Sequence, residues 1–198
     1  MVLPNQLTVL RIILTPVFLI LFLTGEPLMI QISLVVFVIA AITDWYDGWL
    51  ARKFNYITEW GKFLDPLADK VLTSTAFLGF VIIGMLPLWM VVLIILRDLI
   101  ITLLRVYTDY KKISFTTSKS AKWKTFLQMF FLYYLLLFYT LRTFNGLKEN
   151  YRALFNTLLD QNAIYITMFI ITVFTVVTGV VYLVSNHKVI KQLFKHEA

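Results

Sequence analysis

Residues 44–69, DWYDGWLARKFNYITEWGKFLDPLAD, hold four aspartates between strongly apolar segments. Asp44 and Asp47 fall on one face of a helix, and Asp65 and Asp69, four residues apart, share a face of the next. An aspartate inside a membrane-embedded helix costs roughly 2.5–3.5 kcal/mol, and four close together also repel one another. They would therefore take up protons or bind cations. Oxygen ligands suit Mg²⁺, Mn²⁺ or Ca²⁺, two such ions would neutralise four carboxylates, and Mg²⁺ commonly binds a substrate phosphate as well.

Two other interpretations of these aspartates stay open. A DxxD pair at a helix end is often a solvated cap, which explains Asp44 and Asp47 but not a second pair on the next helix. A divalent-cation transporter would use the carboxylates as a transit site. That function does not explain the small and basic residues at fixed offsets from them, which are Gly48, Ala51, Arg52 and Gly61. The small residues leave room for a ligand or another backbone.

The composition places these residues in a membrane protein. Of the 198 residues, 60% are hydrophobic and only 15% charged, whereas about 25% are charged in soluble domains. Cysteine is absent, which excludes disulfides and thiolate chemistry. We expect one domain, 1–198, forming an all-α bundle of six transmembrane helices. Arg11 in the first span lies close enough to its end to snorkel. The expected spans are 7–24, 28–48, 66–85, 87–107, 123–142 and 163–184.

Basic residues set the expected orientation. The second-to-third connection, the fourth-to-fifth connection and the C-terminal tail carry most of the lysines and arginines. By the positive-inside rule, both termini and the acidic stretch face the cytoplasm. The net charge of +7 is thus explained by loops beside anionic lipid, and no feature indicates nucleic-acid binding. The segment before the sixth span is expected along the outer membrane surface, with lipid-facing Leu154, Phe155, Leu158 and Leu159.

Basic side chains near the fourth and fifth spans are candidates for binding an anion. Arg97 and Arg105 lie eight residues apart, near one face of a helix. An intramembrane arginine is a functional-site hypothesis, although Arg97 could equally pair with an acid on another helix. Lys119, Lys122 and Lys124 open the fifth span beside the same cavity. The alternative for these lysines is a solvated loop that attracts anionic lipid.

The acidic pattern resembles the signature of the CDP-alcohol phosphotransferase family, D-x-x-D-G-x-x-A-R, eight residues, then G-x-x-x-D-x-x-x-D. The sequence fills it without departure at Asp44, Asp47, Gly48, Ala51, Arg52, Gly61, Asp65 and Asp69. The segments PNQLTVLRI, LDPLADK and AKWKTFLQM are similar to the phosphatidylglycerophosphate synthase branch. That branch transfers a phosphatidyl group from CDP-diacylglycerol to sn-glycerol 3-phosphate and releases CMP. Inositol phosphate, serine and phosphatidylglycerol stay open as alternative acceptors.

The resemblance implies a fold, cofactors and roles for individual residues. It implies six transmembrane helices around a cytoplasm-facing polar cavity, a homodimer in a bacterial cell membrane, and two divalent cations, Mg²⁺ or Mn²⁺. Asp44, Asp47, Asp65 and Asp69 would bind the metal ions, and Asp69 would also act as the general base on the acceptor hydroxyl. The residues expected to bind CDP-diacylglycerol are Asn5, Thr8, Arg11, Asp44, Asp47, Gly48, Ala51, Arg52 and Gly61. Those expected to bind the acceptor phosphate are Arg97, Arg105, Lys119 and Lys122.

Overall fold

The computed structural model of the protein describes residues 3–54, 59–111, 119–187 and 191, and within these ranges every regular element is a helix. The expected all-α class is therefore confirmed for the described residues. The helices are α1 (Leu3–Leu23), α2 (Pro27–Phe54), α3 (Glu59–Ile82), α4 (Leu88–Tyr110), α5 (Lys119–Leu141), α6 (Asn145–Asn150), α7 (Arg152–Leu158) and α8 (Gln161–Ser185).

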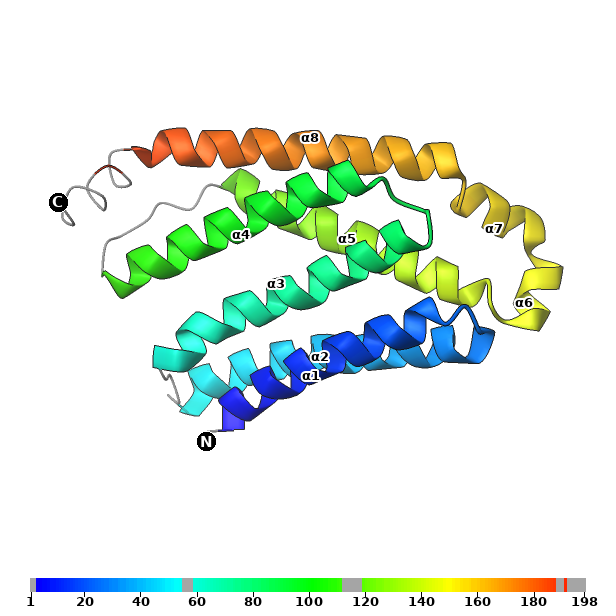
Figure 1. Cartoon of the computed structure of the whole chain (residues 1–198), viewed down its shortest axis with the longest axis horizontal. Coiled ribbons are helices and arrows are strands. Elements are labelled where there is room, and N and C mark those ends of the chain that lie inside the picture. The colour runs from blue at the N-terminus through cyan, green and yellow to red at the C-terminus, as the bar shows by residue number, and fades with distance from the viewer. Residues whose placement is uncertain (1–2, 55–58, 112–118, 188–190, 192–198) are drawn as a thin grey trace.

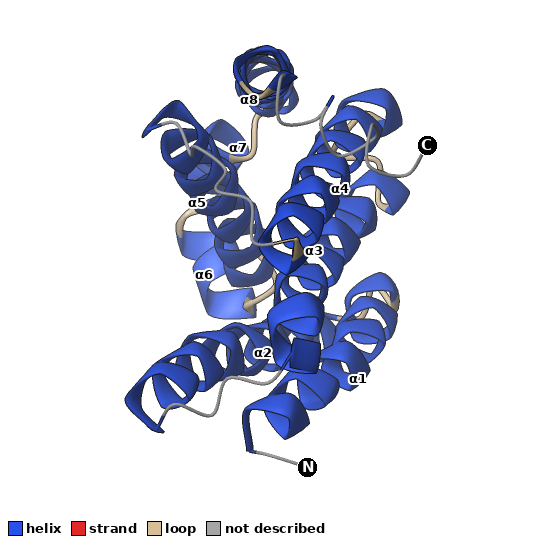
Figure 2. Ribbon diagram, turned by 90° about the vertical axis from the view of Figure 1, so that its left-hand side faces the viewer, coloured by secondary structure: helices blue, strands red, loops and turns tan. Residues whose placement is uncertain are grey.

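The long helices run back and forth along the long axis of the molecule (Figure 1). The ends of α2, α4 and α8 and the starts of α1, α3 and α5 lie together at one end, on the left in Figure 1. Helix α3 stands between the α1–α2 pair and a second group formed by α4, α5 and α8 (Figure 2). This order brings the end of α2 and the start of α3, which carry the acidic stretch, to the same end of the bundle as the start of α5.

Short turns with specific residues reverse the chain at the other end. Gly25 and Gly84 have φ values of +75° and +78°, in the left-handed region that only glycine adopts without strain. Pro27 is the first residue of α2, where its missing amide hydrogen costs nothing. Asp160 caps α8 by accepting a hydrogen bond from the Ala163 amide at 2.9 Å. These turns make antiparallel neighbours of α1 and α2, and of α3 and α4.

Aromatic side chains fill the space between the helices, while apolar side chains also cover the outside. The Phe22 ring of α1 lies with its centroid 5.1 Å from that of Phe80 in α3 and 5.4 Å from that of Tyr139 in α5. On the outer faces, large apolar side chains such as Ile20 and Ile82 are more than half exposed. An apolar exterior of this extent marks a membrane-facing surface.

Four segments are long and apolar enough to cross a membrane, by length and composition: Gln6–Leu23, Pro27–Asp44, Trp123–Leu141 and Arg152–Ser185. Helices α3 and α4 are of similar length but carry charged residues inside their apolar stretches. These charged residues include Asp65, Asp69 and Lys70 in α3, and Arg97, Asp98 and Arg105 in α4. The composition therefore indicates a membrane protein, and the third and fourth expected spans stay predictions.

The segment before α8 differs from the expected interfacial helix. It forms the two short helices α6 and α7, and Phe155 is buried rather than turned to lipid. The Tyr134 hydroxyl of α5 donates a hydrogen bond to the Leu158 carbonyl at 2.6 Å, which holds α7 against the end of the bundle. Leu158 and Leu159 are half-buried there, and Leu154 is exposed. The prediction of a lipid-facing Phe155 is therefore wrong, because α7 packs inward.

Candidate active site

The four aspartates of the acidic stretch lie close enough to act on one another. Asp44 and Asp47 are in the last part of α2, and Asp65 and Asp69 are in the first half of α3. The charge of Asp44 interacts with those of Asp65 and Asp69, and the charge of Asp47 with those of Asp44 and Asp65. The two helices thus gather four carboxylates at one end of the bundle, as their spacing predicts.

Arg11 of α1 joins the two aspartates of α2. Its Nη1 lies 2.7 Å from Asp44 Oδ1, and its Nη2 donates a hydrogen bond to Asp47 Oδ2 at 2.5 Å. The arginine is 0% exposed and Asp47 is 3% exposed, whereas the Asp44 side chain is 42% exposed. The prediction that Arg11 snorkels to the membrane surface is therefore wrong, because α2 supplies two carboxylates that pair with the guanidinium inside the bundle.

Thr8, one turn before Arg11, contacts the other acidic helix. Its hydroxyl donates a hydrogen bond to Asp65 Oδ1 at 2.5 Å, and the threonine is buried. Residues three apart share one face of a helix. Helix α1 therefore presents Thr8 to α3 and Arg11 to α2, and these contacts help to fix three of the four carboxylates.

The donor chemistry of this cluster fits a hard divalent cation, which prefers carboxylate oxygens. Among the described residues, however, no group of three or more His, Cys, Asp or Glu side chains is arranged to hold a metal ion. Arg11 and Thr8 engage oxygens of Asp44, Asp47 and Asp65 in this conformation. The guanidinium thus supplies the positive charge between Asp44 and Asp47, and a cation bound there would have to share or take over those oxygens.

Asp69, the second candidate aspartate of α3, is partly exposed. Its side chain is 35% exposed, and Lys70 Nζ lies 3.7 Å from its Oδ2. That distance exceeds the 2.7–2.9 Å typical of a charged hydrogen bond. The Thr73 hydroxyl donates to the Asp69 backbone carbonyl at 3.1 Å. This hydrogen bond does not use the carboxylate oxygens of Asp69.

The two arginines of α4 are in different surroundings. Arg97 pairs with the adjacent Asp98, Nη1 to Oδ1 at 3.2 Å, and its Nη2 donates to the Thr178 hydroxyl of α8 at 3.4 Å. Arg97 therefore contacts an acid on its own helix rather than on another one. Arg105 is exposed and lies nearer than Arg97 to the end of α4, at the same end of the bundle as the start of α5. The structure thus separates a half-buried Arg97 from a solvent-accessible Arg105.

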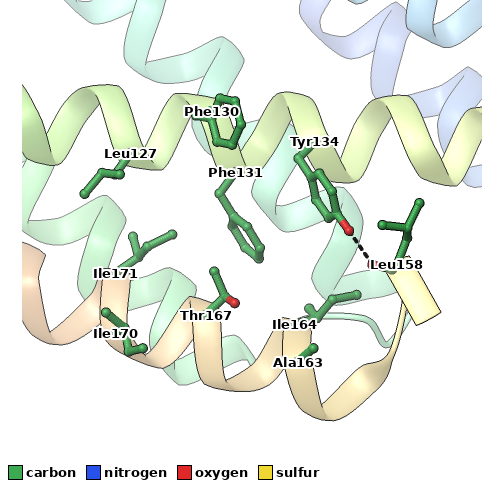
Figure 3. A pocket seen from close by; sticks show the side chains of 10 residues that line it. All are labelled: Leu127, Phe130, Phe131, Tyr134, Leu158, Ala163, Ile164, Thr167, Ile170 and Ile171. Carbon is green, nitrogen blue, oxygen red and sulfur yellow. Dashed lines mark hydrogen bonds between the residues drawn. The ribbon is translucent and has the colours of Figure 1, made fainter.

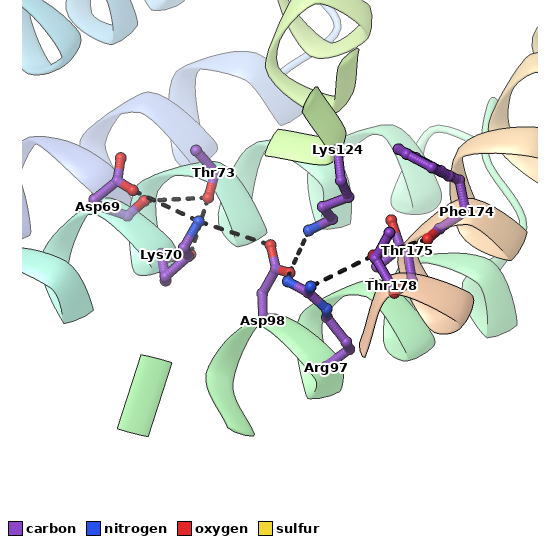
Figure 4. Close-up of polar contacts among 9 residues, drawn as sticks. All are labelled: Asp69, Lys70, Thr73, Arg97, Asp98, Lys124, Phe174, Thr175 and Thr178. Carbon is purple, nitrogen blue, oxygen red and sulfur yellow. Dashed lines mark hydrogen bonds and ion pairs between the residues drawn. The ribbon is translucent and has the colours of Figure 1, made fainter. Parts of the chain in front are cut away.

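Three further charged side chains belong to this region (Figure 4). Asp98 of α4 accepts a hydrogen bond from Lys124 of α5, and its other oxygen lies 3.7 Å from Lys70 Nζ of α3. Lys124 is 1% exposed and Asp98 is 5% exposed. The sequence offered a signal for two of them: Asp98 is adjacent to the intramembrane Arg97, and Lys70 directly follows Asp69. The pairing itself joins distant helices and has no local signature.

Comparison with known proteins identifies the family. A profile of the CDP-alcohol phosphatidyltransferase family matches residues 1–181. The chain belongs to this family. It is 43% identical over 140 residues to a protein of Rickettsia bellii named CDP-diacylglycerol–glycerol-3-phosphate 3-phosphatidyltransferase, covering 68% of this chain and 75% of the relative. A Bacillus subtilis protein of the same name is 44% identical over 115 residues, covering 52% and 60%. The family resemblance predicted from the acidic stretch is confirmed.

The CDP-alcohol phosphatidyltransferase family generally uses divalent cations, which agrees with the donor chemistry of the aspartates. Several of the residues expected to bind the substrates have surroundings that lie outside the described part of the structure. The roles expected for them stay predictions. These residues are Asn5, Gly48, Ala51, Arg52, Gly61, Lys119 and Lys122.

An apolar groove lies apart from the aspartates, between α5 and α8 on the side of α7 (Figure 3). Its volume is about 360 Å³, and Leu127, Phe131 and Ile171 are among the side chains that line it. Its polar groups are few, chiefly the Thr167 hydroxyl and the Tyr134 hydroxyl, and the latter donates to Leu158. Among the residues that the structure describes, no carboxylate or cation lines it, so the chemistry of this family member is to be sought at the aspartates.

Proposed function

We propose that this protein transfers the phosphatidyl group of CDP-diacylglycerol to sn-glycerol 3-phosphate, forming phosphatidylglycerophosphate and CMP. One observation carries the proposal: four aspartates gathered from α2 and α3 within a chain that matches the family from residue 1 to 181. The names of the Rickettsia bellii and Bacillus subtilis relatives support glycerol 3-phosphate as the acceptor. The enzyme would be metal-dependent, with Mg²⁺ or Mn²⁺ held by the aspartates.

The reaction forms one phosphorus–oxygen bond and breaks another. A hydroxyl oxygen of glycerol 3-phosphate attacks the phosphorus that bears the diacylglycerol, the bond to CMP breaks, and CMP leaves with the bonding electrons. Asp69 takes the hydroxyl proton, a role that its partial exposure and the 3.7 Å between its Oδ2 and Lys70 Nζ support. Asp44, Asp47 and Asp65 would hold the divalent cations with Asp69. A cation bound there neutralises phosphate charge and stabilises the leaving group.

Basic residues near the aspartates are the proposed contacts of the acceptor phosphate. Arg105 is exposed toward the end of α4, and Lys119 and Lys122 lie at the start of α5, at the same end of the bundle as the aspartates (Figure 1). Arg97 is a further contact, although its pairing with Asp98 and Thr178 restrains it. A phosphate with about two negative charges needs fixed cations in a site of low polarity.

We also propose six membrane spans with the aspartates at the cytoplasmic side of a bacterial cell membrane. Helix α3 has 24 residues and α4 has 23, and at 1.5 Å per residue both exceed the roughly 30 Å of a bilayer core. The burial of Asp98 among cations of α3, α4 and α5 supports α4 as a span that carries charge. A homodimer is the proposed assembly, which mass measurement of the protein in nanodiscs tests.

The function is tested with purified protein, CDP-diacylglycerol and Mg²⁺ in mixed micelles. We expect CMP release that depends on glycerol 3-phosphate, stops with a chelator and returns with Mg²⁺. Parallel reactions receive inositol phosphate, serine or phosphatidylglycerol, and mass spectrometry identifies the lipid formed. Faster product formation with one of these acceptors would contradict the proposed specificity, and no CMP with any acceptor would contradict the transferase function itself.

A further inference from the structure

A buried charge cluster, formed by Asp98 and the three cations around it, stands beside Asp69. Asp98 Oδ1 accepts a hydrogen bond from Lys124 and lies 3.2 Å from Arg97 Nη1, while its Oδ2 lies 3.7 Å from Lys70 Nζ. The cations come from α5, α4 and α3, and Arg97 continues the contacts to Thr178 of α8 (Figure 4). One carboxylate thus joins four helices of the bundle.

The cluster connects directly to the proposed general base. The ammonium of Lys70 lies 3.7 Å from Asp69 Oδ2 and also 3.7 Å from Asp98 Oδ2. Neither distance is that of a charged hydrogen bond, which is about 2.7–2.9 Å. Lys70 therefore stands between two carboxylates that attract it from opposite sides. It forms a close pair with neither of them.

The composition of the cluster is not that of a simple neutralising pair. Three cations surround Asp98, so the group carries an excess of positive charge even when Asp69 is counted with it. Lys124 alone would neutralise a structural Asp98. A buried cluster that served stability alone would not benefit from additional unpaired positive charge. Neutralisation of Asp98 therefore does not account for its attraction of Lys70. We look for the reason in the contact between Lys70 and Asp69.

We propose that Asp98 is a positioning residue for the phosphatidyl transfer. By drawing Lys70 toward α4, it prevents a close ion pair between Lys70 and Asp69. Such a pair would occupy Asp69 Oδ2 and turn this oxygen away from the acceptor hydroxyl. The inference rests on the proposed function, because Asp98 acts on the reaction only if Asp69 accepts the proton of the acceptor hydroxyl.

The variant Asp98→Asn tests this role, since it keeps the size of the side chain and removes its charge. Lys70 then has Asp69 as its remaining carboxylate in the cluster and closes on it. We expect kcat to fall about tenfold or more, with an unchanged KM for CDP-diacylglycerol, because the loss affects the proton acceptor rather than the donor lipid. Asp109→Asn, an exposed position on the same helix, is the matched control and should retain wild-type kinetics.

The double variant Asp98→Asn/Lys70→Met decides between positioning and a general structural role. Without the ammonium no close pair forms, so kcat should rise above that of Asp98→Asn and approach that of Lys70→Met alone. Independent structural damage would instead multiply the two losses. A double variant slower than Asp98→Asn, or a reduction in kcat/KM of Asp98→Asn that arises wholly from KM, overturns the inference.

Folding is controlled in a second background. Asp98→Asn leaves Lys124 buried without its carboxylate, which can lower the yield of folded protein. The same comparison is then made in Lys124→Met, where the buried ammonium is gone and Asp98 keeps Lys70 and Arg97 as its cations. The wild-type reaction distinguishes a failure of the proposed function from a failure of the role of Asp98. A wild type that forms no CMP refutes the proposed function, whereas an active wild type with multiplying losses refutes the role of Asp98 alone.

Discussion

Replacing Arg11 by methionine removes a buried guanidinium that lies between two carboxylates of α2. Asp47, 3% exposed, would lose its ion pair, while Asp44 is partly exposed and can be hydrated. Removing one partner of a buried ion pair costs about 3–5 kcal/mol. The partly exposed pair with Asp44 adds at most about 1 kcal/mol. We therefore expect Arg11→Met to lower the free energy of unfolding by about 3–5 kcal/mol, chiefly through Asp47.

The assay is unfolding in dodecyl maltoside micelles with increasing dodecyl sulfate, followed by tryptophan fluorescence in the presence of a chelator. Arg152→Met, which changes an exposed arginine, should stay within about 0.5 kcal/mol of wild type. The double variant Arg11→Met/Asp47→Asn should recover part of the loss, because no buried charge is left unpaired. A loss below about 1 kcal/mol for Arg11→Met, or no recovery in the double variant, would refute this reasoning.

The same variant reports whether Arg11 and a divalent cation share carboxylates. Arg11→Met frees oxygens of Asp44 and Asp47 that the guanidinium engages in the wild type. Added Mg²⁺ should therefore raise the free energy of unfolding of Arg11→Met by more than that of the wild type. An equal increase in both proteins would mean that the cation binds without using those oxygens.

Three other predictions follow from contacts in the site. Asp69→Asn should lower kcat by about 10²-fold or more while CDP-diacylglycerol still binds, because the proton acceptor is lost. Gly179→Ala places a Cβ 2.8 Å from Arg97 Cγ and should cost about 1–3 kcal/mol in unfolding free energy, whereas Gly146→Ala, with open space around it, is the neutral control. Arg105→Ala should raise the KM for glycerol 3-phosphate about tenfold, because a phosphate-binding cation is removed.

Each of these predictions has a result that contradicts it. Near-wild-type turnover of Asp69→Asn would remove the general base from the mechanism. Equal stability of the two alanine variants would show that Arg97 is not held tightly against α8. An unchanged acceptor KM in Arg105→Ala would exclude this arginine from the acceptor pocket.

The acidic stretch shows which features a sequence reveals. Asp65 and Asp69 are four residues apart, and Asp44 and Asp47 are three apart. On a helix, residues at these spacings share a face, so the gathering of the four carboxylates was predictable. The helical class was also predictable, because long apolar runs in a bilayer must satisfy their backbone hydrogen bonds internally. The family signature then assigned roles that spacing alone left open.

The partners of the buried cations were not predictable. Arg11 is near the end of its span, which made snorkelling the simpler expectation. Its burial depends on how α1 packs against α2, a contact between residues 36 positions apart at Asp47. The hydrogen bond from Lys124 to Asp98 likewise depends on tertiary packing of α4 and α5. Phe155 was misjudged because its burial requires α7 to fold back onto the bundle.

The central claim is that the aspartate cluster catalyses transfer of a phosphatidyl group to glycerol 3-phosphate. The most direct measurement quantifies CMP and lipid product in the same reaction, with purified wild type, CDP-diacylglycerol and Mg²⁺. We predict one CMP for each phosphatidylglycerophosphate formed after glycerol 3-phosphate is added, and formation of both products slower by about 10²-fold or more with Asp69→Asn. CMP release at the same rate without glycerol 3-phosphate, or equal product formation by Asp69→Asn, would contradict the claim.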